Sequence, residues 1–350
     1  ERLLKARRPL LWLGGGARHA STAAARFVKM GFAIVTSVQG RGTVPEDHPQ
    51  TLGSYNLQKP VERFYETLDA MLVVGSRLRS NETLTYQLHL PATRYRIDAN
   101  PLAENRAYTS ERFIQGDAQL TLNALADRLE GRMQIDPELA HDVQQARREA
   151  VALIDGAIGP YVKLKNALGE VARKNIWWVR DITLSNNMWG NREPALDHPR
   201  AGVHALGGGI GQGLAMGIGA AVADTQHGLG RKTVALCGDG GFMLNVGELA
   251  CAAQEQANVL FIVMNDQRYG VIRNIQDDIY GSRHCYVDLH TPDFAQFCAS
   301  MQVPHWRLRD PDATAATLRE AMAVQGPAVV EVDMNAWGPF AAKFAGPPKK

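Results

Sequence analysis

The sequence lacks long hydrophobic runs and is poor in cysteine. Its four cysteines, Cys237, Cys251, Cys285 and Cys298, are far apart and form no C-x-x-C pair. This spacing disfavours a zinc knuckle or a disulfide framework and fits a reducing cytoplasm. The longest aliphatic runs, such as Val259–Met264, are far shorter than the ~20 residues that a membrane span needs. We therefore expect a cytoplasmic protein with no membrane partner.

An excess of charge of either sign is also missing. Lys and Arg together number 38 and Asp and Glu 36, which gives a formal net charge of +2. Such a balance leaves no basic footprint for nucleic acid. Hydrophobic residues make up 45% and charged residues 21%, a mixture typical of globular proteins. At ~100–200 residues per domain, the length indicates two or three domains.

Short apolar segments alternate with helical stretches in two successive parts of the chain. In the first part the strand candidates are Leu10–Leu13, Ala33–Ser37, Ala70–Val74 and Arg94–Ile97. In the second part they are Ile176–Val179, Thr233–Cys237, Val259–Met264 and Ala328–Val332. This alternation is typical of a parallel sheet covered by helices on both faces. We predict two consecutive three-layer α/β domains with mostly parallel sheets.

A charged helical stretch separates the two parts. Residues 136 to 157 carry many charges with Ala, Val and Leu at helical spacing, and Gly159 and Pro160 end the pattern. We predict a Rossmann-like middle domain over residues 1–135, a linker helix over residues 136–160 and a C-terminal domain over residues 161–350.

Acidic residues follow two consecutive apolar segments of the second domain. Gly238-Asp239-Gly240 ends the first and Asn265-Asp266 ends the second, with 24 residues between Gly240 and Asn265. A β-α-β crossover makes the two strands parallel, so both acids lie at the rim where ligands bind in open α/β sheets. Two carboxylates there repel each other unless a cation lies between them. Oxygen ligands of this kind suit Mg²⁺ or Ca²⁺.

The helix after the first of these strands opens with Gly240-Gly241. Its bare backbone N–H groups and the positive end of its dipole face the same rim. A cation together with such amides makes a diphosphate site. An isolated Gly-Asp-Gly or Asn-Asp is usually an ordinary turn, but the two at the ends of consecutive strands are much more specific.

This stretch resembles the thiamine-diphosphate (ThDP) signature, in which Gly-Asp-Gly is followed about two dozen residues later by Asn-Asn. The segment Gly208–Ala220 resembles the glycine-rich loop and helix that precede this signature. Arg8–Gly16 and Gly40–Pro49 resemble the middle domain of acetolactate-synthase-like enzymes. The resemblance covers essentially the whole chain. It is to the superfamily of ThDP-dependent 2-oxoacid decarboxylases and carboligases, with acetolactate synthase large subunits as the more particular match.

The resemblance implies roles for individual residues. Asp239, Asp266 and the backbone carbonyl of Arg268 would bind Mg²⁺. Ile210 would wedge between the two rings of ThDP, and the carbonyl of Gly208 would accept a hydrogen bond from the 4′-amino group. The implied cofactor-binding positions are Thr183, Ser185, Gly208, Gly209, Ile210, Gly238, Asp239, Gly240, Gly241, Phe242, Asn265, Asp266, Tyr269 and Gly270.

The sequence also departs from the family pattern. Asp266 stands where the family usually has Asn, so the site carries an extra negative charge. Residues 54–57 read Ser-Tyr-Asn-Leu, unlike the Gly/Met/His-rich segment of flavin-binding members, so FAD is not expected. Gly14-Gly15-Gly16 does not complete a G-x-G-x-x-G pattern and favours a structural strand-to-helix turn.

The function implied by the resemblance is ThDP- and Mg²⁺-dependent decarboxylation of a 2-oxoacid with carboligation. A non-ligating decarboxylase similar to benzoylformate decarboxylase, or a catalytically silent cofactor-binding subunit, stay open as alternatives. In this family the activating Glu lies on an N-terminal pyrimidine domain, normally of the neighbouring subunit. No residue of this chain matches it, so we assign no catalytic residue and expect the chain alone to be inactive. The implied partners are a small 2-oxoacid and further copies in a dimer or tetramer.

Overall fold

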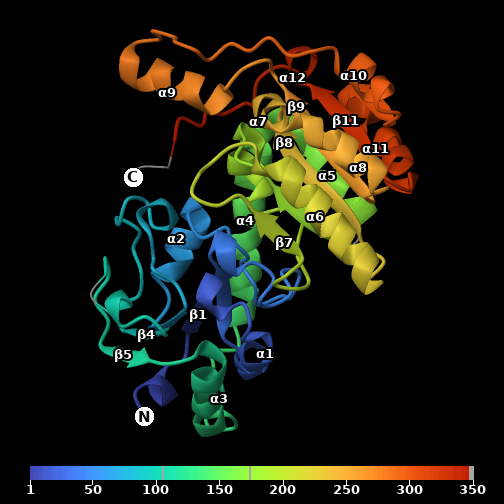
Figure 1. Cartoon of the computed structure of the whole chain (residues 1–350). Coiled ribbons are helices and arrows are strands. Elements are labelled where there is room, and N and C mark those ends of the chain that lie inside the picture. Colours follow the sequence, from blue (N-terminus) through green and yellow to red (C-terminus); the bar gives the residue numbers. More distant parts are fainter. Residues whose placement is uncertain (105, 173–174, 347–350) are drawn as a thin grey trace. The chain divides into compact units, whose positions relative to one another are not determined.

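The structure is a computed structural model that describes residues 1–104, 106–172 and 175–346. The chain forms two compact units (Figure 1). Unit 1 comprises Glu1–Leu153 and Ala195–Arg200, and unit 2 comprises Ile154–Pro194 and Ala201–Gly346. The short segment Ala195–Arg200 thus groups with unit 1, although the residues on both sides of it belong to unit 2. No helix in the described ranges is long and apolar enough to cross a membrane.

Unit 1 is built on a five-stranded parallel sheet with the strand order β2-β1-β3-β4-β5. The strands are β1 (Pro9–Leu13), β2 (Ala33–Thr36), β3 (Ala70–Val74), β4 (Arg94–Asp98) and β5 (Arg112–Gln115). The helices are α1 (Ser21–Met30), α2 (Lys59–Tyr65) and α3 (Ala118–Leu129), and α4 (Leu139–Ile158) contains the boundary between the units. Short 3₁₀ helices lie at Leu3–Lys5, Gly15–Ala17, Val38–Gly40, Ser80–Glu82 and Pro101–Ala103.

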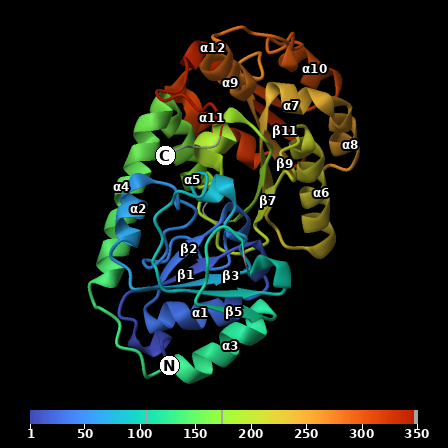
Figure 2. The ribbon, with the colours of Figure 1, turned by 90° about the vertical axis from the view of Figure 1, so that its left-hand side faces the viewer.

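Helices α1 and α3 lie side by side on one face of this sheet (Figure 2). Their apolar residues recur at helical spacing: Phe27 on α1 and Leu122 on α3 are fully buried. They pack on side chains such as Leu72 of β3. Helix α1 ends at Gly31, whose φ of +99° favours glycine and whose N–H caps the last turn.

The glycine run after β1 packs against the loop after β3. A Cβ placed on Gly75 would lie only 2.5 Å from the backbone carbon of Gly16, and one placed on Gly16 would lie 2.9 Å from Gly75 Cα. A Cβ on Gly14 would overlap the Gly75 carbonyl oxygen. The two loops approach each other so closely that only glycine fits. This contact supports the structural role expected for Gly14-Gly15-Gly16.

Unit 2 is built on a six-stranded parallel sheet with the strand order β10-β11-β9-β8-β6-β7. The strands are β6 (Ile176–Arg180), β7 (Gly202–His204), β8 (Lys232–Gly238), β9 (Val259–Asn265), β10 (His305–Leu308) and β11 (Ala328–Asp333). The helices are α5 (Val162–Ala172), α6 (Gln212–His227), α7 (Asp239–Leu244), α8 (Leu249–Gln254), α9 (Gly270–Tyr280), α10 (Phe294–Ser300), α11 (Thr314–Ala323) and α12 (Met334–Trp337). Shorter turns are the 3₁₀ helices Gly159–Tyr161, Val246–Glu248 and Pro311–Ala313 and a π-helix at Asn186–Gly190. The two parallel-sheet units confirm the predicted fold class.

Helix α6 packs closely on the middle of this sheet because glycines lie on its inner face. A Cβ on Gly217 would lie 3.1 Å from Ala235 Cβ on β8 and 3.1 Å from Phe261 on β9. Strands β8 and β9 are adjacent and parallel, with Gly238 opposite Met264. The β-α-β arrangement predicted from the sequence is therefore present, and both strands end at the same rim.

Candidate cofactor and metal site

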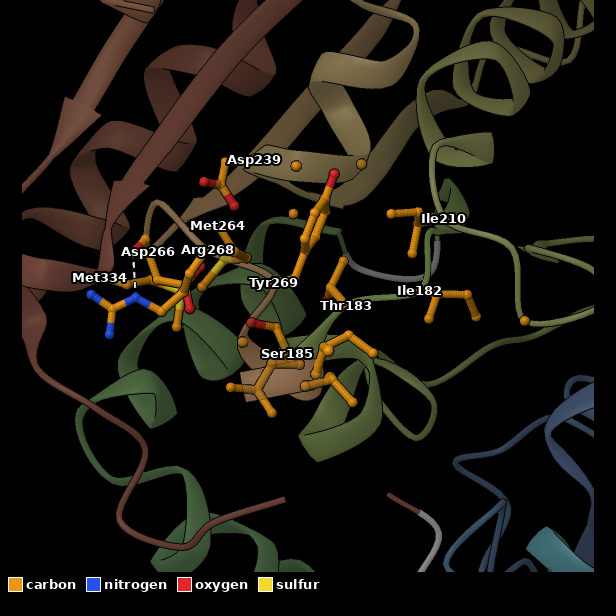
Figure 3. A pocket seen from close by; sticks show the side chains of 18 residues that line it. Ile182, Thr183, Ser185, Ile210, Asp239, Met264, Asp266, Arg268, Tyr269 and Met334 are labelled. Carbon is orange, nitrogen blue, oxygen red and sulfur yellow. Dashed lines mark hydrogen bonds between the residues drawn. The ribbon is translucent and has the colours of Figure 1, made fainter. Parts of the chain in front are cut away.

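A pocket of about 450 Å³ lies at the carboxyl ends of β6, β8, β9 and β11 (Figure 3). It contains most of the residues that the sequence predicts for the site. Those that line it are Thr183, Ser185, Gly208, Ile210, Gly238, Asp239, Gly240, Gly241, Asp266, Arg268, Tyr269 and Gly270.

Three predicted positions do not line the pocket. Phe242 turns its side chain into the core, where it packs edge-on against Phe261 and Phe294 with ring centroids 5.7 and 5.8 Å away. Asn265 is buried and directs its amide along the sheet. Gly209 is in the glycine-rich loop but not in the pocket wall, and its carbonyl accepts from Gln212 Nε2 at 3.0 Å.

The pocket also has an apolar wall that the sequence did not reveal. The residues of this wall are Ile182, Leu184, Met264, Val271, Ile272 and Met334. Met334 directly follows β11, so the rule that placed Asp239 and Asp266 could have found it. Ile182 and Leu184 alternate with Thr183 and Ser185 after β6. An apolar wall of this kind limits water around a bound ligand.

Asp239 opens α7 at the end of β8 and is only 2% exposed. Its Oδ2 atom has no hydrogen-bond partner within the described ranges. Burial, and then the nearby Asp266 carboxylate, raise the pKa of Asp239 to about 7. A buried carboxylate oxygen without a donor is costly unless a cation or another ligand satisfies it. This orphaned oxygen fits a divalent metal ion.

Asp266 lies at the end of β9 in the same pocket. Burial raises the pKa of Asp266 to about 6, and the positive charge of Arg268 counteracts part of this rise. Arg268 also donates from Nε to the Asp266 backbone carbonyl at 3.0 Å, which closes the turn after the strand. The described residues contain no cluster of three or more His, Cys, Asp and Glu side chains that could hold a metal ion. A cation here would therefore have two carboxylates and would complete its shell with carbonyl, water or ligand oxygens.

Two consecutive glycines, Gly240 and Gly241, follow Asp239 in the first turn of α7 and form a glycine cradle. A Cβ on Gly240 would lie 2.5 Å from Cε1 of Tyr269, and one on Gly241 would lie 2.8 Å from Oδ2 of Asp181. Figure 3 shows the Tyr269 ring standing in the pocket between Asp239 and Ile210. A side chain at either position would meet these neighbours, so both residues line the pocket with backbone atoms alone.

Asp181 is a buried anchor of the site that the sequence reading did not single out. Its Oδ2 accepts from the Gly211 N–H at 2.9 Å and its Oδ1 from the Ile182 N–H at 2.7 Å. The backbone of Gln212 and Gly213 also donates to it, yet burial raises the pKa of Asp181 overall. It thereby holds the start of α6, next to Ile210 in the pocket wall. Its position directly after β6 was the available signal.

The segment after β6 presents hydroxyl groups to the pocket. Thr183 Oγ1 accepts from the Asn186 N–H at 2.9 Å, at the start of the π-helix. Ser185 is 1% exposed, and its Oγ has no partner in the part of the chain that the structure describes. A buried hydroxyl of this kind is available to a ligand in the pocket.

Comparison with known protein families identifies both units. The model of the thiamine pyrophosphate enzyme central domain matches residues 1–125, and the model of the thiamine pyrophosphate enzyme C-terminal TPP binding domain matches residues 185–332. The chain therefore belongs to the thiamine pyrophosphate enzyme family, of which it contains these two domains. This confirms the resemblance seen in the sequence.

The chain is also similar in sequence to individual members of this family. The chain is 31% identical to the probable 2-ketoarginine decarboxylase AruI of Pseudomonas aeruginosa, covering 95% of this chain and 59% of that protein. It is 25% identical to acetolactate synthase 2 of Zea mays, covering 94% and 54%, and 25% identical to the acetolactate synthase isozyme 1 large subunit of Escherichia coli, covering 95% and 59%. The chain thus spans between half and two thirds of the length of these relatives.

A solved structure shares the fold. It belongs to a Mycobacterium smegmatis protein assigned to the thiamin diphosphate-dependent enzymes, with a TM-score of 0.70 and 20% identity. The match covers 95% of this chain and 62% of that one. The succession of two parallel-sheet units is therefore an architecture already seen in a solved structure.

Proposed function

We propose that the pocket of unit 2 binds ThDP with Mg²⁺ and that the whole protein decarboxylates a 2-oxoacid. The observation that carries this proposal is the orphaned Oδ2 of Asp239, buried beside Asp266 at the rim of the sheet. Hard divalent cations prefer such oxygen ligands. The family match of residues 185–332 to a TPP binding domain supports the same assignment.

In this proposal, different residues bind the metal ion and the diphosphate. Asp239, Asp266 and the Arg268 carbonyl hold Mg²⁺. The amides of Gly240 and Gly241 face the diphosphate. Burial, and then repulsion by the Asp266 carboxylate, raise the pKa of Asp239, and a divalent cation between the two ionised carboxylates would offset this repulsion.

Further residues orient and shield the cofactor. The Ser185 hydroxyl would donate a hydrogen bond to the bound cofactor, and Ile210 would pack against it. Ile182, Leu184 and Met264 exclude water from the pocket wall. When bound, ThDP supplies the electron sink that 2-oxoacid decarboxylation needs.

Two reactions are candidates for the whole protein. Carboligation after decarboxylation is favoured by the acetolactate synthases among the relatives. Decarboxylation without ligation is favoured by the higher identity to the 2-ketoarginine decarboxylase, 31% against 25%. A catalytically silent subunit is the least supported candidate, because the pocket retains both carboxylates and the glycine cradle.

The same proposal includes a cytoplasmic homo-oligomer. Large apolar side chains near the pocket are exposed in unit 2: Leu206 by 70%, Leu244 by 55% and Ile272 by 47%. Exposed apolar side chains in one region are typical of a protein interface. A second copy of the protein is the partner that the family resemblance implies. Sedimentation of the whole protein tests this part of the proposal.

Calorimetry tests the cofactor assignment. We expect ThDP to bind the wild-type chain only with Mg²⁺ present and Asp239→Ala to lose this binding. Asp312→Ala is a matched control, because it removes an exposed carboxylate of unit 2 that does not line the pocket. Binding by Asp239→Ala equal to that of the wild type, or no binding by the wild type with Mg²⁺, would refute the assignment.

A further inference from the structure

Asn265 connects the proposed metal loop to a buried acid on the next strand. It is the last residue of β9 and immediately precedes Asp266. Its Nδ2 donates to Glu331 Oε1 at 2.7 Å. Glu331 lies on β11, which pairs directly with β9, and it is only 3% exposed. A buried carboxylate thus receives a charge-assisted hydrogen bond from the residue beside the metal loop.

The other side of the same amide closes the turn around Asp266. Asn265 Oδ1 accepts from the Gln267 N–H at 3.2 Å. Gln267 has a φ of +56°, a left-handed conformation that a residue with a side chain adopts only at a cost. The Gln267 N–H also interacts with the Asp239 carboxylate. The Asn265 amide therefore helps to hold the backbone between Asp266 and Arg268, two of the three proposed metal ligands.

Glu331 decides which way the Asn265 amide faces. An amide can present either its oxygen or its nitrogen, whereas an ionised carboxylate only accepts. Facing Glu331, the amide must offer Nδ2, which leaves Oδ1 for the Gln267 N–H. The second oxygen of Glu331 has a neighbour of its own, because His305 Nε2 lies 3.2 Å from Oε2.

We propose that Glu331 is a positioning residue for the metal loop: by fixing the Asn265 amide it sets the turn that carries Asp266 and the Arg268 carbonyl. The link to Mg²⁺ rests on the proposed function, while the link to the turn rests on the hydrogen bonds alone. The ion pair of Glu331 with Arg307 does not explain why Glu331 is buried. Its contact with Arg307 Nε is 3.7 Å, and the Arg307 side chain is 49% exposed.

Swapping the amide of Asn265 and the carboxylate of Glu331 between the two strands tests the proposed positioning role. Glu331→Leu removes the acceptor, and Asn265→Asp sets two carboxylates against each other. The double variant Asn265→Asp with Glu331→Gln reverses the hydrogen bond, because the new amide on β11 donates to the new carboxylate on β9. That carboxylate still accepts from the Gln267 N–H. Val330→Ala is the control, since it weakens the same buried strand without touching Asn265.

Two measurements on the full chain separate the two parts of the proposal. The first is amide hydrogen exchange at Gln267 without ligand, and the second is calorimetric affinity for ThDP with Mg²⁺. Each single variant should speed exchange and weaken binding about tenfold, as for the loss of one buried charge-assisted hydrogen bond. The double variant should recover most of the slow exchange at Gln267 and most of the affinity for ThDP with Mg²⁺. Val330→Ala should lower the unfolding midpoint and leave the Gln267 exchange relative to its neighbours unchanged.

Contrary results are equally clear. Unchanged exchange at Gln267 in Glu331→Leu, or a double variant no better than Asn265→Asp, overturns the positioning role. Faster exchange with unaltered Mg²⁺–ThDP affinity overturns its link to the metal. A wild-type chain that binds no Mg²⁺–ThDP refutes the proposed function instead, while the exchange data still decide the role of Glu331. If Glu331→Leu does not fold, the Asn265→Asp and double variants give the answer.

Discussion

Lys232 Nζ donates a hydrogen bond to Asn258 Oδ1 at 2.7 Å at the start of β8. It donates a second one to the Val324 carbonyl at 2.6 Å. Both acceptors are neutral, and the lysine is only 7% exposed. Burial therefore lowers the pKa of Lys232 from 10.5 to about 8.

This lowered pKa predicts a pH-dependent stability. Between pH about 8 and 10.5 the unfolded chain holds the Lys232 proton more tightly than the folded chain does, so the free energy of unfolding rises with pH in that window. The gain is on the order of 3 kcal/mol. Urea unfolding of wild type and Lys232→Met across this range should show the rise only in the wild type. The exposed Lys163→Met serves as control, and an equal slope in Lys232→Met would contradict the prediction.

Asp181 should matter for both stability and cofactor binding. Asp181→Ala removes the acceptor of the Gly211 and Ile182 amides, and we expect a loss of about 1–3 kcal/mol in unfolding free energy. It should also weaken Mg²⁺–ThDP binding, because the start of α6 carries the residues next to Ile210. Asp293→Ala removes a helix cap on α10 outside the pocket, so it should lower stability alone. Equal binding by the two variants would count against the role given to Asp181.

Two glycines on helices of unit 2 should respond oppositely to alanine. Gly219 lies on the exposed face of α6 with open space around a Cβ, so Gly219→Ala should raise stability by about 0.5–1 kcal/mol. Gly240→Ala should lower it, because the new methyl would meet Tyr269 and Leu289 at 2.5 and 2.8 Å. Thermal unfolding of both variants decides, and a stabilising Gly240→Ala would show that the cradle has spare room.

Replacing the acid at position 266 should keep or improve the affinity for ThDP. Asp266→Asn removes one negative charge that would face the diphosphate, and it removes the repulsion on Asp239. The variant should keep the fold and keep or improve ThDP affinity, as measured by calorimetry with Mg²⁺. Loss of binding in Asp266→Asn together with retention in Asp239→Ala would show that the metal ligands are wrongly assigned.

The 350 residues alone should turn over no 2-oxoacid. The resemblance puts the activating Glu on a pyrimidine domain that these residues do not match, so the cofactor would stay in its unreactive form. Pyruvate decarboxylation by the purified chain, at a rate well above that of free ThDP, would disprove this. Fusion to a pyrimidine domain of a relative should restore turnover, and a Glu-to-Gln change in that domain should abolish it again.

The strands show where sequence reading works. β3 is apolar throughout, and β9 is apolar up to its last residue, Asn265, because both strands are buried on both faces; this continuous pattern predicted them. β5, β7 and β10 went unpredicted. All three are edge strands with partly exposed residues, so burial imposes no apolar run on them.

In the candidate site, too, some residues could be predicted from the sequence and others could not. Asp239 and Asp266 could be predicted because each directly follows an apolar strand, and parallel strands end together. Glu331 could not, since its role depends on a neighbour 66 positions away in the sequence. The core position of the Phe242 side chain was equally hidden, because it is set by Phe261 and Phe294 on other elements.

Helix α9 begins at Gly270 in the pocket wall, and none of its eleven residues is buried. A short helix without a buried face is marginal by itself, so α9 depends on a few contacts such as Asn274 Nδ2 to the Phe344 carbonyl at 2.9 Å. The free energy of locally unfolding α9 is therefore small. Binding of a ligand that contacts Gly270 is weakened by the conformational entropy lost when the helix becomes ordered. Substitutions that only change the helix propensity of α9 would then shift ligand affinity without touching the ligand.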